Sequence, residues 1–291
     1  MALVLAGCAL PAPVPPQPPL PYPPAAAQRV VRLALAEWRD WGSIARAAWT
    51  PAPALPPVES APENFPRVLA YWRAVEDDEG AIRDNRPIYA AALAGTATVA
   101  PTGMAATALW SEPAWSAAFV SWVFRSAGVD AREFPPNATH SLYLDALIGD
   151  ALRFPALAPF LPQDPAGYAP RPGDLVCFDR SRVKLRHWRE RLAETGRPRP
   201  MHCDITTGVA PGVVEVVGGN VSDAVTMTRY PADAAGILAQ LPEDQTPEGH
   251  VPAGQAPQGR AAILLVMQSR LGQLPPFGYS ATTTAQDTST R

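Results

Sequence analysis

The order of apolar patterns along this 291-residue chain is the feature that most constrains its fold. Up to residue 152, apolar residues recur at helical spacing, whereas later apolar runs are short, β-rich and bounded by Gly, Pro, Asn or Asp. The expected helices cover 26–48, 65–78, 85–95, 117–127 and 140–152. The expected strands cover 172–178, 202–209, 212–219, 224–230 and 261–267. Helices followed by strands predict an α+β domain, with N-terminal helices packed on an antiparallel sheet.

Composition and charge narrow the class of protein. An apolar share of 47% is enough to build a sizeable core. A formal charge of -3 argues against nucleic-acid binding, which needs a concentrated basic face. No run reaches the roughly 18 apolar residues that span a bilayer. The three cysteines have no zinc-site spacing, so we expect neither a metal nor another cofactor.

The first ten residues, MALVLAGCAL, resemble a truncated bacterial lipoprotein signal over 1–8. In such signals Leu-Ala-Gly precedes a cysteine that becomes acylated, so the resemblance makes Cys8 the lipidation site; an incidental cysteine in a short apolar tail is the alternative. The proline-rich segment 9–27 predicts a stiff spacer. The resemblance implies a protein tethered to a membrane of the bacterial cell envelope and facing the periplasm. No aspartate follows Cys8, which favours the outer membrane.

The predicted folded domain covers 28–272, and the polar tail 273–291 is expected to be disordered. With Cys8 lipidated, Cys177 and Cys203 remain as an even pair, and in an exported protein such a pair favours a disulfide. Two buried free thiols are the alternative.

Four short motifs suggest a chemistry: AWSAAFVSW at 114–122, PGDLV at 172–176, MHCDI at 201–205 and GGNVSD at 218–223. In this order they resemble the papain-like cell-wall peptidases and amidases of the CHAP and NlpC type. They resemble still more closely an uncharacterised family of proteobacterial lipoproteins, domain of unknown function 2272. The first resemblance implies a papain-like fold, in which a cysteine at a helix N-terminus attacks an amide and a strand histidine is its base.

Carried onto this chain, the resemblance places Ser116 at the position of the cysteine nucleophile and His202 at the position of the base. Asn220 or Asp204 would orient that base. CHAP domains often have an acid two residues before this asparagine, where the present chain has Gly218. A helix N-terminus ionises a thiol but not a hydroxyl, so Ser116 would need neutral His202 to take its proton.

Each of these residues also has a structural interpretation. Ser116 is a good helix N-cap, His202 a common buried strand residue, and Asn220 a turn former. Trp115, beside Ser116, and His140, ahead of a helix, are expected to line a substrate cleft, although a cap or surface position is the safer interpretation of His140.

Two functional hypotheses follow. The first is hydrolysis of an amide in a peptidoglycan stem peptide by a Ser-His site. The second is a catalytically inactive domain that binds peptidoglycan or an envelope protein partner through the same cleft; a purely structural envelope role is a third possibility.

The lipidation hypothesis gives a direct prediction. Expressed in a bacterium with its native upstream sequence, Cys8→Ser protein should move from the membrane fraction to the soluble fraction, because the acyl chains are what hold the protein to the membrane. Cell fractionation and mass spectrometry measure the change. Unchanged membrane association together with an unchanged mass would remove the lipoprotein assignment.

Overall fold

The structure is a computed structural model that describes residues 25–48, 58–75, 80–95, 109–240 and 262–272. Cys8, the tail 273–291 and most of the predicted spacer 9–27 lie outside the described residues. Within the described ranges, no helix has both the length and the apolar character that a membrane span requires.

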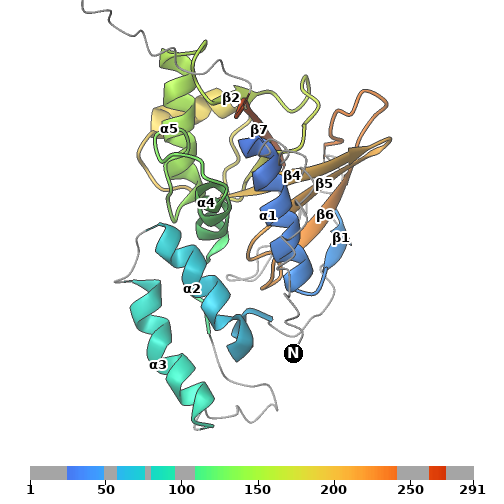
Figure 1. Cartoon of the computed structure of the whole chain (residues 1–291). Helices are drawn as coiled ribbons and strands as arrows, with labels where there is room; N and C mark the ends of the chain where they lie inside the picture. The colour runs from blue at the N-terminus through green and yellow to red at the C-terminus, as the bar shows by residue number, and fades with distance from the viewer. Residues whose placement is uncertain (1–24, 49–57, 76–79, 96–108, 241–261, 273–291) are drawn as a thin grey trace, which may run out of the picture.

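Five α-helices form where the apolar spacing predicts them, in the first part of the chain (Figure 1). They are α1 (Ala26–Asp40), α2 (Phe65–Ala74), α3 (Ala81–Leu93), α4 (Ser116–Ser126) and α5 (His140–Arg153). Three short 3-10 helices accompany them: η1 (Val58–Ser60), η2 (Pro62–Asn64) and η3 (Trp188–Glu194). α4 is buried nearly all round, as its composition predicts, and α2 packs along it.

Seven strands form one sheet in the order β1-β6-β5-β4-β3-β7-β2. They are β1 (Ala45–Ala47), β2 (Phe160–Gln163), β3 (Leu175–Asp179), β4 (Met201–Ala210), β5 (Val213–Gly218), β6 (Thr226–Pro231) and β7 (Ile263–Ser269). The α+β class is therefore correct. The prediction of a wholly antiparallel sheet is wrong, because β1 pairs with β6 in parallel.

The two unpredicted strands have local causes. Positive φ angles at Gly42 and Ser43 end the predicted helix 26–48 early, so its last residues run as β1. β2 contains Pro162, which removes a ladder donor, and β2 lies at the edge of the sheet, where a proline is tolerated.

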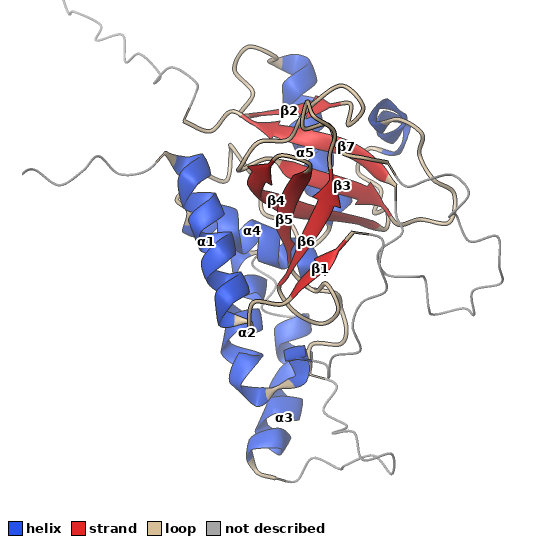
Figure 2. Cartoon of the chain, turned by 90° about the vertical axis from the view of Figure 1, so that its right-hand side faces the viewer, coloured by secondary structure: helices blue, strands red, loops and turns tan. Residues whose placement is uncertain are grey.

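The helices and the sheet form two layers, with α1 and α4 against one face of the sheet (Figure 2). That face includes Cys203, Ile205 and Val217. The opposite face has a smaller core, in which Phe178 of β3 and Tyr230 of β6 stack with ring centroids 5.6 Å apart. Since two strands lie between β3 and β6, this contact requires the sheet to curl, and the face that holds it is hereafter the concave face.

Two close contacts fix the strands near α4. Cys177 and Cys203 are directly opposite on β3 and β4 and are joined by a disulfide. At the end of β5, a Cβ atom on Gly219 would lie 2.5 Å from Cβ of Phe119 on α4, so only glycine allows this approach.

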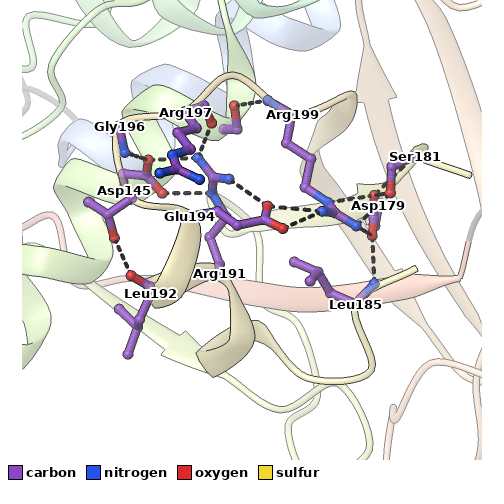
Figure 3. A network of polar contacts seen from close by, with 12 residues as sticks. Asp145, Asp179, Ser181, Leu185, Arg191, Leu192, Glu194, Gly196, Arg197 and Arg199 are labelled. Atoms are coloured by element: carbon purple, nitrogen blue, oxygen red, sulfur yellow. Dashed lines mark hydrogen bonds and ion pairs between the residues drawn. The ribbon is translucent and has the colours of Figure 1, made fainter. Parts of the chain in front are cut away.

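An ion-pair network ties the segment between β3 and β4 to α5 (Figure 3). Arg191 of η3 is only 1% exposed and donates to both carboxylate oxygens of Asp145, each at 2.8 Å. Arg199 donates in the same way to Asp179 and Glu194. The network holds the N-terminal part of β4 beside α5, which is where the candidate site lies.

The buried pair should be worth far more than an exposed pair on the same helix. Asp145→Ala should lower the free energy of unfolding by about 3 kcal/mol, because it leaves the buried Arg191 guanidinium without its main counter-charge. Asp150→Ala removes the exposed pair with Arg153 and should cost less than about 1 kcal/mol. Urea denaturation measures both variants, and equal losses would show that the Arg191 pair does not anchor the segment.

Candidate active site

Ser116 is the first residue of α4, and its side chain does not cap the helix. The N-cap position belongs to Trp115, whose side chain makes no cap hydrogen bond. The capping interpretation of Ser116 is therefore wrong. The first amides of any α-helix have no acceptor within the helix, and at the N-terminus of α4 they carry partial positive charge beside the Ser116 hydroxyl.

The hydrogen-bond partner of Ser116 is His140, not His202. Oγ of Ser116 lies 2.7 Å from Nε2 of His140, which opens α5. The other ring nitrogen, Nδ1, lies 2.6 Å from the hydroxyl of Tyr143, one turn further along the helix. Burial, and then the nearby charges of His202 and Arg180, hold the pKa of His140 well below its usual range. His140 is therefore neutral at physiological pH.

His202 pairs with Asp204 instead. Its Nε2 lies 2.7 Å from Oδ1 of Asp204, and its ring meets that of His140 edge to face, with centroids 5.2 Å apart. Nδ1 of His202 is buried and has no hydrogen-bond partner in the part of the chain that the structure describes. The predicted Ser116–His202 contact fails because strand alternation turns His202 and Asp204 toward the concave face, while Cys203 faces the layer that contains α4.

Gly218 makes room for the Asp204 carboxylate. A Cβ atom on Gly218 would lie 1.7 Å from Oδ1 of Asp204 and 3.1 Å from Nε2 of His202. CHAP domains often have an acid at the position of Gly218. Here Asp204 of the neighbouring strand β4 places its carboxylate in the space that a side chain at position 218 would fill. Of the two residues predicted to orient His202, Asp204 is the one in contact.

Two other predicted site residues serve the fold. Asn220 adopts a left-handed conformation with φ of 53°, which fits its interpretation as a turn residue, and neither ring nitrogen of His202 bonds to it. Trp115 is wholly buried and stacks on Trp41, so it cannot line an open cleft as predicted.

Glu59 is a site neighbour that the sequence did not indicate. Its buried carboxyl group accepts a 2.7 Å hydrogen bond from Nε1 of Trp115, directly beside Ser116. Burial is the main cause that raises the pKa of Glu59 to about 8, and repulsion from Asp223 and Glu112 adds to it. The hydrogen bond from Trp115 acts in the opposite direction and lowers the pKa. Glu59 lies within the proline-rich stretch 51–63, which has no helical or strand periodicity, so no pattern pointed to it. Tyr143, by contrast, follows His140 by three residues, a spacing that places both on one helix face.

Comparison with known proteins gives a family and no activity. A family model described as an uncharacterized protein conserved in bacteria, DUF2272, matches residues 59–259. No curated protein and no solved structure gives a match. Among the described residues, no three His, Cys, Asp or Glu side chains gather as metal ligands would.

Glu59 should make stability depend on pH. Because its folded pKa is about 8 and its ordinary value 4.5, its contribution to stability is fully present below pH 4.5 and is lost as the pH rises toward 8. Glu59→Gln keeps an acceptor for Trp115 without the charge, so it should be more stable than wild type at pH 8.5 and show a weaker decline. Thermal unfolding from pH 4.5 to 8.5 measures this. The exposed Glu63→Gln is the control, and an identical pH response in wild type and Glu59→Gln would contradict the assignment.

Proposed function

We propose a hydrolytic function for this chain, which belongs to the DUF2272 family of bacterial proteins. The proposed reaction is hydrolysis of an amide bond in a peptidoglycan stem peptide, with Ser116 as nucleophile and His140 as general base. The observation that carries the proposal is the 2.7 Å contact between the Ser116 hydroxyl and a neutral imidazole at the N-terminus of a buried helix. A papain-like ancestry of the fold is part of the proposal.

The first half of the reaction forms an acyl-enzyme. Nε2 of His140 takes the hydroxyl proton as Oγ of Ser116 attacks the amide carbon. The oxygen of that carbonyl becomes negative and is stabilised by the first-turn amides of α4. The C–N bond then breaks, and the leaving nitrogen takes the proton from His140. Water attacks the acyl group by the same route, which releases the acid and restores Ser116.

The histidine must carry a positive charge in between, inside a buried site. The carboxylate of Asp204 would be the nearby negative group, since it contacts Nε2 of His202, whose ring centroid lies 5.2 Å from that of His140. Because the pKa of His140 is held low, His140 stays neutral at mildly acidic pH and remains able to accept a proton. Protonation of His140 should therefore not lower the rate of hydrolysis between pH 7 and pH 6.

The substrate class follows from the proposed location. With Cys8 lipidated and the spacer extended, the domain would face the periplasm from the outer membrane, where peptidoglycan amides are within its reach.

One observation favours the second candidate, a catalytically inactive binding domain. The buried Tyr143 hydroxyl stays protonated because its pKa is raised, and its hydrogen-bond contact is with Nδ1 of His140. If Tyr143 donates there, the ring proton lies on Nε2, so His140 donates to Ser116 and cannot act as its base. Hydrolysis needs the other tautomer, in which Nδ1–H donates to Tyr143.

Turnover of purified peptidoglycan separates the two candidates. Ser116→Ala should abolish release of new amino or carboxyl termini, and His140→Gln should lower the rate at least about 1,000-fold, because each removes part of the proton-transfer pair. Ser121→Ala is the matched control, since Ser121 lies on the same helix but bonds to Asn137. Wild-type protein that binds peptidoglycan without cleaving it, with Ser116→Ala binding equally well, would establish the inactive binding domain instead.

A further inference from the structure

The concave face of the sheet carries a row of residues that extends from the His202–Asp204 pair to the sheet edge. Arg46 of β1 is in register with Thr228 of β6, Thr228 with Val216 of β5, and Val216 with Thr206 of β4. Residues in register point to the same face, and Asp204 precedes Thr206 by two positions. Arg46 and Asp204 therefore belong to one surface.

Arg46 is a buried cation that pairs with no anion among the described residues. It is only 9% exposed, and its buried Nε and Nη1 have no hydrogen-bond partner in that part of the chain. None of the ion pairs formed by the described residues includes Arg46. Two more buried polar atoms on this face, Oγ1 of Thr206 and Nδ1 of His202, have no hydrogen-bond partner within the described ranges.

A guanidinium carries a permanent positive charge. A buried charge persists only where an opposite charge or a set of hydrogen bonds compensates it. Asp204 does not compensate the charge of Arg46, since its Oδ1 contacts Nε2 of His202 and it forms no ion pair with Arg46.

Arg46 is also within electrostatic range of the candidate site. Its charge and that of Asp204 act on the same phenol, Tyr230. Tyr230 stacks on Phe178, whose ring centroid lies 6.4 Å from that of His202. Arg46 therefore lies on the same buried face of the sheet as His202 and Asp204.

We propose that Arg46 is an anion-binding residue, which pairs with a free carboxylate of a ligand on the concave face, with unpaired Oγ1 of Thr206 on the same row. A peptide with a free terminal or side-chain carboxylate has the matching chemistry, because a guanidinium presents planar N–H donors to both carboxylate oxygens. That this carboxylate belongs to the substrate rests on the proposed function; the binding of an anion does not.

The test compares two probes that differ in one charge, N-acetyl-D-alanine and its amide, on the full chain carrying Ser116→Ala so that no turnover occurs. The carboxylate should raise the melting temperature saturably, and the amide should not. Arg46→Gln should weaken carboxylate binding at least 10-fold. Arg229→Gln, which removes an exposed arginine from neighbouring β6, should leave it unchanged. If N-acetyl-D-alanine does not raise the melting temperature of Ser116→Ala protein that keeps Arg46, the proposal is wrong. It is also wrong if the amide raises that temperature equally, whatever the two arginine variants show.

A second measurement needs no ligand. In buffer without carboxylate, Arg46→Met protein should melt at a higher temperature than protein with Arg46, because the substitution removes an uncompensated buried charge. A lower melting temperature for Arg46→Met would show that the chain itself compensates Arg46, and would contradict the proposal. If wild-type protein fails to cleave peptidoglycan while the carboxylate still binds through Arg46, the proposed function fails and the anion site stands.

Discussion

The packing of α4 between the other helices and the sheet is the contact on which the rest of the structure depends. Because α4 is buried nearly all round, it has no freedom to shift along its axis, and its first residue is held at a fixed depth. Gly219 permits this close approach, and any side chain there would displace Phe119. Ser116, Trp115 and, through Trp115, Glu59 all take their positions from this one helix end.

Burial, rather than counter-charge, sets the protonation states around Ser116. It keeps His140 neutral by lowering its pKa, and it keeps Glu59 protonated near neutral pH by raising its pKa. Two ionisable groups that flank α4 thus carry no charge at pH 7, although one is a base and the other an acid. The charged members of the neighbourhood, Asp204 and Arg46, lie on the concave face. The neutral hydroxyl–imidazole pair and these buried charges meet at His202, whose ring lies edge to face against that of His140 and whose Nε2 contacts Asp204.

The sequence predicted the helices and strands better than the contacts between them. Helical spacing located all five helices and the β-rich runs located five of seven strands, because each pattern reports the local burial of one element. It missed β1, where positive φ at Gly42 and Ser43 redirects the chain, and β2, which its proline disguised. At the site, the order of the motifs indicated Ser116 and His202. Which of the two histidines reaches Ser116, however, depends on the face of the sheet toward which β4 turns each side chain and on where α5 begins. Those are long-range facts that no local pattern contains, and for the same reason the ion-pair partners of Arg191 were not foreseen.

The disulfide between Cys177 and Cys203 closes a covalent ring around the arginine-rich segment that joins β3 to β4. A peptide bond cut by a protease anywhere between the two cysteines would leave both fragments linked and both strands in place. Such a nicked molecule would migrate as one chain until a reductant separated its halves. The ring thus makes that segment, in which several arginines are exposed, a stretch where backbone cleavage need not dismantle the site.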